Sequence, residues 1–173
     1  MAWSTTNDAA DFLGAAGSFL RSRPTDHTTL LTVTESLLLR GPTAYGTAPP
    51  LLGWWLAGPG DVAGAFLHTP PHPVTIGPVP AAAVPALAGL LAATHRQVTG
   101  VVADQPTATV FAAEWQRRTG ATGHLHHRQR LYRLGRLTPR RPQPPGRARR
   151  AGPGDRDTLL AWHVAFGDEV GRP

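Results

Sequence analysis

Apolar residues recur at helical spacing within the first forty positions of the chain. From Asn7 or Asp8 to Arg21 they lie three and four positions apart behind a polar start, and a proline follows shortly afterwards. This pattern predicts an amphipathic helix with a polar N-cap. Residues 26–40 show the same spacing and stop at Gly41, although their threonine and valine content also suits a strand. We therefore expect two helices in succession.

Shorter apolar runs follow, separated by turn-forming residues. Residues 51–57 and 62–69 flank a Gly-Pro-Gly-Asp sequence, and residues 74–77 come after Pro-Pro-His-Pro. Runs of this length between such turns predict a three-stranded antiparallel meander. Neighbouring residues of a strand face opposite sides of the sheet, so we expect one of Trp54 and Trp55 in the core. The other would then be covered by a helix or by a partner domain.

The next part of the chain alternates between helical and strand patterns. Residues 80–94 are rich in alanine and leucine and begin with a proline, which is typical of a helix start. Residues 98–103 form a short apolar run, and residues 105–119 show helical spacing up to Gly120. Residues 123–134 alternate between two sets of side chains. We expect them to be, in order, a helix, a strand, a helix and a last strand.

The end of the chain looks like the start of a second domain. Residues 138–146 are proline-rich and predict an extended linker. Residues 147–170 combine a basic extended start, a Gly/Pro turn, an N-cap candidate at Asp155 and an apolar helical stripe. Because such a helix cannot bury its apolar face alone, we expect a domain over 1–137 and a truncated second domain over 147–173. The positions of the stripe are Leu159, Leu160, His163, Phe166 and Val170.

Composition excludes several kinds of chemistry. The chain has no cysteine, which excludes disulfides, thiolate zinc sites and a cysteine nucleophile. All seventeen basic residues are arginine, a pattern that resembles GC-rich actinobacterial coding. Eleven of them lie between Arg117 and Arg150, with no carboxylate between Glu114 and Asp155. No signal-peptide pattern and no apolar run of membrane-spanning length is visible, so we expect a cytoplasmic protein without membrane contact.

The order of these predicted elements resembles the GNAT superfamily of N-acetyltransferases with its first strand missing. The stretches that carry the resemblance, in order, are FLRSRP, LLTVTESLLLRGP, YG, GWW, GAFLHTPPHP, RRTGATGHLHHRQRLYRLGRLTP and AGPGDRDTLLAWHVAFGDEVG. They resemble the N-terminal region of two-part actinobacterial acetyltransferases and cover almost the whole chain. The resemblance implies an α/β (α+β) fold: a mixed, mostly antiparallel sheet flanked by helices, followed by an incomplete second GNAT start.

The resemblance also implies acetyl transfer from acetyl-CoA to an amine in the complete protein. GNAT enzymes hold the coenzyme diphosphate with a Gln/Arg-x-x-Gly-x-Gly/Ala loop after the third meander strand, where backbone N–H groups make an anion site. Here the corresponding residues, 75–81, contain Pro78 and Pro80, which have no N–H, and lack Gln and Arg. We expect a non-catalytic first copy with no cofactor-binding residues, while the catalytic residues of the complete protein stay unassigned.

An acceptor side can be placed only through the resemblance. In GNAT proteins the helices of the corresponding region help to wall the amine site, which implies Trp162, Asp168 and Glu169 as acceptor-side residues for a small amine. The alternative is a solvated helix end. The expected partners are a missing C-terminal GNAT domain, or a second copy through an exposed apolar face.

Histidines and arginines offer further candidates. His124 and His126 would share one strand face, and His68 and His72 flank two prolines, but no carboxylate lies nearby to complete a ligand set, so we expect no metal. The arginine run could bind phosphates, yet Tyr132 is its single aromatic residue, and a solvated strand face with a linker explains most of it. Nucleic acid is therefore not expected. The alternative function is a GNAT-like binding or scaffold module whose arginine-rich edge binds an acidic partner.

Overall fold

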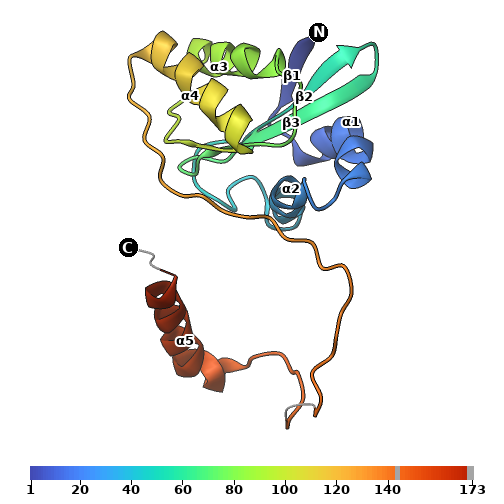
Figure 1. The fold of residues 1–173 in the computed structure, drawn as a ribbon, viewed down its shortest axis with the longest axis vertical. Helices are drawn as coiled ribbons and strands as arrows, with labels where there is room; N and C mark the ends of the chain where they lie inside the picture. Colours follow the sequence, from blue (N-terminus) through green and yellow to red (C-terminus); the bar gives the residue numbers. More distant parts are fainter. Residues whose placement is uncertain (143–144, 171–173) are drawn as a thin grey trace. The chain divides into compact units, whose positions relative to one another are not determined.

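A five-stranded open sheet forms the centre of residues 1–133. The computed structural model describes residues 1–142 and 145–170 and divides the chain into two compact units, 1–133 and 134–173. The strands lie in chain order and are β1 (Ala2–Thr6), β2 (Leu51–Gly58), β3 (Asp61–His68), β4 (Val74–Ile76) and β5 (Val101–Val102). The first three pairings are antiparallel and β4 pairs with β5 in parallel. This confirms the mixed, mostly antiparallel fold class (Figure 1).

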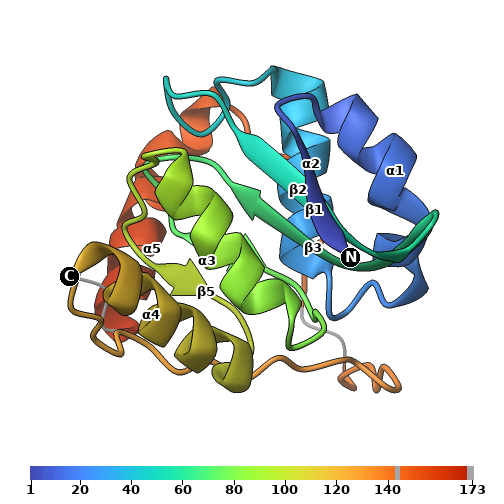
Figure 2. The same cartoon turned by 90° about the horizontal axis from the view of Figure 1, so that it is seen from above.

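Helices cover both faces of this sheet. Figure 2 shows α1 (Ala9–Ser22) and α2 (Thr28–Arg40) on one side, with α3 (Ala83–Ala93) and α4 (Gln105–Thr119) on the other. Phe12 and Leu30 pack with Leu52 and Leu67 in one core cluster, whereas α3 and α4 pack with Phe66 and other sheet residues in a second one. The sheet therefore separates two hydrophobic layers.

The two predicted N-terminal helices are confirmed, with Asp8 before α1 and Gly41 after α2 as predicted, but α2 begins at Thr28 rather than at Asp26. The Asp8 carboxylate accepts hydrogen bonds from the backbone N–H groups of Ala10 (2.6 Å) and Asp11 (3.1 Å), as an N-cap does. At the end of α2, Gly41 adopts a φ of +87°, which a residue without a Cβ tolerates, and its N–H donates to the Leu37 carbonyl.

The predicted hairpin is confirmed as β2 and β3, and the two tryptophans face opposite sides of the sheet. Trp55 is 4% exposed and meets Trp3 edge-on, with 5.5 Å between ring centroids. Trp54 is partly buried under α1, with its ring 6.4 Å from that of Phe12. Side chains of both layers thus anchor the same strand.

The resemblance predicted that the first strand was missing, and this was wrong. Residues 2–6 form β1 and pair with β2, with Trp3 opposite Trp55. The Trp3 indole N–H also donates to the Ala83 carbonyl of α3 (2.8 Å), and its ring packs edge-on against Phe66. A five-residue strand with a single large apolar residue carries too weak an alternation to be recognised without its partner strand.

The middle elements match with shifted boundaries. Helix α3 begins at Ala83 rather than Pro80, because a turn comes first, in which the Pro80 carbonyl accepts from the Ala83 N–H (2.9 Å). Strand β5 is two residues long, shorter than the predicted 98–103. Helix α4 has the predicted bounds, with Gly120 in the left-handed conformation after its last residue.

The predicted strand over 123–134 was wrong. These residues are exposed and form no helix or strand, and no hydrogen-bonded strand partner for them occurs in the described part of the chain. Leu125 and Leu131 are 71% and 65% exposed. Alternation indicates a strand only where a neighbouring strand accepts its hydrogen bonds, and here none does.

The second unit contains a short 3₁₀ turn, η1 (Pro153–Asp155), and helix α5 (Arg156–Glu169). The helix was predicted, but the strand expected from residue 147 does not form between 147 and 152. Asp155 was also predicted to cap α5, but its side chain forms no capping hydrogen bond with this helix. Its carboxylate instead accepts from Arg149 (2.6 and 2.7 Å) and from the Gly152 N–H, and these contacts lower its pKa to about 2.

The predicted linker, 138–146, forms no helix or strand where it is described, and its residues 143 and 144 lie outside the described residues. The same holds for positions 171–173 of the predicted second domain. Among the helices of residues 1–142 and 145–170, none combines the length and the apolar character needed to span a bilayer.

Candidate functional site

A cleft of about 450 Å³ opens at the carboxyl ends of the parallel strands β4 and β5. Its size falls in the range of small-molecule sites, and crevices at the carboxyl ends of parallel strands are frequent ligand sites. The cleft is lined by Asp26, Thr29, Leu30, Thr75, Ile76, Gly77, Pro78, Val102, Ala103, Asp104, Gln105, Gln129 and Leu131. It is therefore built from the starts of α2 and α4, the ends of two strands, and the extended stretch after α4.

The turn after β4 has few backbone donors to offer a ligand. The Gly77 N–H donates to the Ala65 carbonyl (3.0 Å), which continues the pairing with β3. Pro78 and Pro80 have no N–H, so Val79 carries the one amide of residues 77–80 without a backbone acceptor in the described structure. The first amides of α3 are also engaged, since Ala83 and Val84 donate back into the turn. Residues 77–80 therefore offer no run of consecutive free amides, whereas the amides of Ala81 and Ala82 donate to no backbone acceptor in the described structure.

Two carboxylates give the cleft its charge. Asp104 caps α4: its oxygens accept from the Thr107 N–H (2.9 Å) and the Thr107 hydroxyl (3.1 Å). Asp26 lies 3.8 Å from Arg23, and both side chains are about half exposed. No arginine or histidine is among the residues that line the cleft. Both charged residues among those that line the cleft are therefore acidic, while Arg128 and Arg130 flank its lining residue Gln129 in the sequence.

A buried histidine, His27, packs next to Gly77, which is one of the residues that line the cleft. His27 is 0% exposed, its Nδ1 lies 3.0 Å from the Leu20 carbonyl oxygen, and its Nε2 has no hydrogen-bond partner. A Cβ added to Gly77 would come within 3.1 Å of the His27 ring, so the glycine allows the imidazole to pack against the end of β4. Sequence patterns gave no signal for this residue.

The cleft carboxylates were also missed, although one of them had a signal. Asp104 follows an apolar run and precedes a helix that carries proline near its first position, which is the usual place of an N-cap. Asp26 and Asp104 are 78 positions apart in the sequence, and only the folded sheet brings the starts of α2 and α4 to one cleft.

The predicted acceptor-side residues lie on α5 in the second unit. Trp162 is 68% exposed, and Glu169, seven positions later, lies on the same side of the helix next to Asp168. Their role toward an amine stays a prediction.

The predicted pairing of His124 and His126 on one strand face was wrong, because no strand forms there. Instead, His126 and His127 stack with 4.3 Å between ring centroids, both exposed to solvent. Within residues 1–142 and 145–170, no cluster of three or more His, Asp or Glu side chains could hold a metal ion.

His68 and His72 lie near the other end of β4, away from the cleft. His68 is 0% exposed, and neither ring nitrogen has a hydrogen-bond partner. Burial, together with the nearby charge of Arg96, lowers the pKa of His68 to about 4. His72 is exposed and meets the Tyr45 ring edge-on at 5.9 Å. The two histidines are therefore not a ligand pair.

Comparison of the chain with protein-family models, with curated proteins and with solved structures gives no match.

Proposed function

We propose that residues 1–133 form a GNAT-like domain of an N-acetyltransferase, and that this domain does not itself hold acetyl-CoA. The order of the sheet carries the proposal. Three antiparallel strands lead into one parallel pair, β4 and β5, joined by α3, and a cleft opens where that pair ends. The sequence resemblance implies the same order of elements.

The chemistry of the cleft supports a non-catalytic role. The turn after β4 carries two prolines and an engaged glycine amide, and the cleft is lined by two carboxylates. A coenzyme diphosphate would need free amides or cations at this place. In this proposal the acetyl-CoA site belongs to another GNAT domain, in a cytoplasmic enzyme.

The cleft is suited to a small amine instead. Asp26 and Asp104 would attract an ammonium group, and Gln105 and Gln129 offer amide groups for further hydrogen bonds. In the complete reaction, a base removes a proton from the amine and its nitrogen attacks the thioester carbonyl. The thiolate of coenzyme A then leaves. We assign no residue of this chain to those steps.

Calorimetry and NMR test both parts of the proposal on the 173-residue chain. Acetyl-CoA should give no heat of binding at micromolar concentrations. 1,4-Diaminobutane should shift the amide signals of Gly77 and Gln105, and the D26N/D104N variant should bind it several-fold more weakly. The D11N/D61N variant removes two exposed carboxylates outside the cleft and should bind it as the native chain does.

Micromolar binding of acetyl-CoA, or release of free thiol when the diamine is added, would overturn the non-catalytic role. Equal weakening by both double variants would show that the diamine responds to overall charge, which would overturn the amine site.

A second candidate function rests on the arginines. Six arginines between Arg128 and Arg141 are exposed, and none of them forms an ion pair within the described residues. A binding module that uses this stretch for an acidic partner is therefore an alternative, and it can coexist with an acetyltransferase role.

A further inference from the structure

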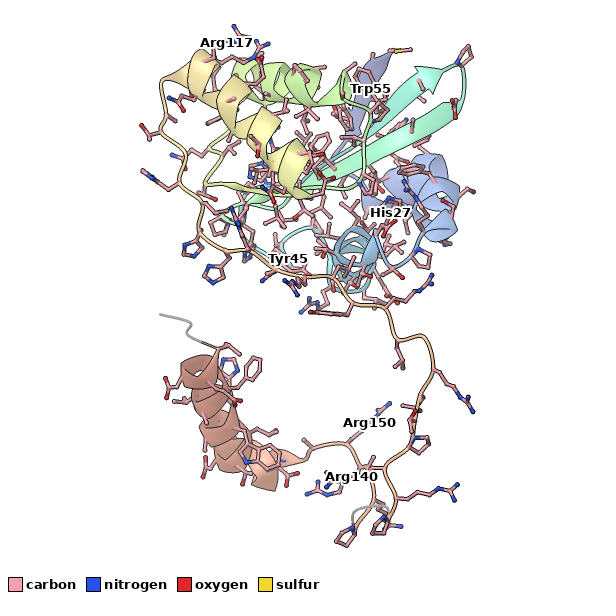
Figure 3. All side chains as sticks on the ribbon, in the orientation of Figure 1. His27, Tyr45, Trp55, Arg117, Arg140 and Arg150 are labelled. Atoms are coloured by element: carbon pink, nitrogen blue, oxygen red, sulfur yellow. The ribbon has the colours of Figure 1, made fainter. Side chains whose placement is uncertain are left out.

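We propose that the arginine segment, residues 124–142, binds single-stranded nucleic acid. This inference deepens the second candidate function and is independent of the acetyltransferase role. The segment contains Arg128, Arg130, Arg133, Arg136, Arg140 and Arg141, together with three histidines and Tyr132. Figure 3 shows Arg140 on a stretch of the chain that forms no helix or strand.

The positive charge of the protein is concentrated in this part of the sequence. No carboxylate occurs between Glu114 and Asp155, and three more arginines follow the segment before Asp155. Residues 1–116 have four arginines against seven carboxylates, so the folded sheet and its helices do not attract a polyanion. A polyanion would therefore bind the segment, because phosphate contacts need clustered positive charge.

The arginines of the segment are available for such contacts. All of its residues are exposed, and no described carboxylate lies within 4 Å of its guanidinium groups. In contrast, Arg117 and Arg118 are held by Glu114 at 2.6 and 3.4 Å, and Arg149 is held by Asp155. Binding through the segment breaks no existing ion pair.

The structure also removes the reason for which nucleic acid was not expected. The arginines do not lie on the face of a sheet, since residues 123–134 form no strand, and Tyr132 is not the single planar group. His126 and His127 are already stacked, and Tyr132 is 78% exposed between Arg130 and Arg133. Aromatic rings and guanidinium planes stack on unpaired bases. The segment therefore offers arginines for the phosphates and planar groups for the bases of a single strand.

The lack of helix and strand in the segment favours a polymer over a compact acidic surface. At about 3.3 Å per residue, the segment can follow a partner for about 60 Å. No helix occurs in it that could enter the major groove of a duplex. A single strand follows an extended chain more readily and exposes its bases for stacking.

Fluorescence anisotropy with a labelled 20-nucleotide oligouridylate tests the proposal on the full chain. If the six arginines contact six phosphates, the affinity should fall about 300-fold between 50 and 200 mM salt, from the slope of about −0.7 per contact for single strands. R128Q/R130Q/R133Q should weaken binding and lower the salt slope by about 2. R21Q/R23Q/R156Q removes the same charge outside the segment and should leave both values close to native.

A second variant, H126A/H127A/Y132A, isolates the stacking contribution. It should weaken binding about tenfold or more while the salt slope stays unchanged, because it removes planar groups and no arginine. All six residues changed in the two segment variants are exposed, so circular dichroism should show native folding.

Four results would overturn the proposal: no binding at 50 mM salt, an equal loss in the control triple variant, tighter binding to a duplex of the same length, or no effect of the stacking variant. Binding to polyglutamate as tight as to the oligouridylate would also overturn it and assign the segment to an acidic protein. None of these results affects the diamine and acetyl-CoA measurements, which report on the cleft.

Discussion

Two fully buried imidazoles show how the same side chain is held in different ways. His27 uses one ring nitrogen for a contact with the Leu20 carbonyl, whereas His68 has no hydrogen-bond partner at either nitrogen. A buried group without partners loses the solvation of its charged form, so folding keeps the His68 imidazole neutral. This makes His68 a residue at which proton binding and folding are linked.

We predict that His68 makes the protein less stable in mild acid. Its pKa is about 4 in the folded state and about 6.5 in the unfolded state. Between these values the unfolded chain binds one more proton, so the free energy of unfolding falls as pH falls from about 6.5 to 4. The slope approaches about 1.4 kcal/mol per pH unit. Urea unfolding of native and His68→Leu proteins at several pH values should show that the variant has a smaller slope in this window.

Above pH 7 the His68→Leu substitution should leave the slope unchanged, because the imidazole is neutral in both states. The exposed His72→Leu variant is the control and should keep the acid dependence of the native protein. An unchanged slope in His68→Leu between pH 4 and 6.5 would contradict the linkage.

Asp104 has two separable roles, as a helix cap and as a cleft carboxylate. Asp104→Ala should lower the free energy of unfolding by about 1 kcal/mol, since the Thr107 N–H loses its acceptor. Asp104→Asn keeps a side-chain oxygen for the cap, so its free energy of unfolding should fall by much less. Thermal and urea unfolding measure the contribution of the cap to stability, whereas diamine binding measures the contribution of the charge. An equal loss of stability in both variants would argue against the capping role.

At the scale of elements, the sequence predicted those helix ends that are set by residues close together in the chain. The bounds of α4 and the end of α2 could be predicted because caps and stops act within a few residues, as Gly41 and Gly120 do. Strand β1 and the stretch 123–134 could not, because pairing depends on residues far away in the sequence. Trp3 lies opposite Trp55 of β2, whereas the alternating stretch 123–134 pairs with no strand of the described structure.

The features of the candidate site could likewise be predicted only in part. The two missing amide donors after β4 could be predicted, since Pro78 and Pro80 have no N–H in any conformation. The acidic cleft could not be predicted, because its two carboxylates come from helices on opposite faces of the sheet. His27 also required the structure, since only the folded chain brings its ring against Gly77 at the end of β4.

The close packing of β1, β2 and β3 predicts a sharp contrast between two glycines of β2. A Cβ added to Gly53 would overlap the Phe66 ring and lie 2.9 Å from the Ser4 carbonyl oxygen, whereas one added to Gly58 meets no atom within 4 Å. Gly53→Ala should therefore destabilise the protein by about 2–4 kcal/mol. Gly58→Ala should change stability by less than about 1 kcal/mol. Urea unfolding measures both, and similar losses would contradict the packing of the three strands.

At the scale of the whole molecule, order and charge are distributed unequally along the chain. Residues 1–120 contain every strand and four of the five α-helices of the described structure, and they are slightly acidic. Nine arginines lie between Arg128 and Arg150, in a part of the chain that forms no helix or strand where it is described. A site that needs a fixed arrangement of side chains is therefore expected in the sheet and its helices. Binding that needs clustered positive charge is expected between Arg128 and Arg150.

This distribution predicts where trypsin cuts first, because the protease needs an extended, accessible stretch around an arginine. The first cuts should fall between Arg128 and Arg150 and leave a long-lived fragment that begins at Met1. Arg21 and Arg40 are protected by α1 and α2, and the Arg96 guanidinium donates to the Pro49 carbonyl (3.1 Å). Mass spectrometry of brief digests identifies the sites, and early cleavage after any of these three arginines would contradict the assignment of order to the sheet and its helices.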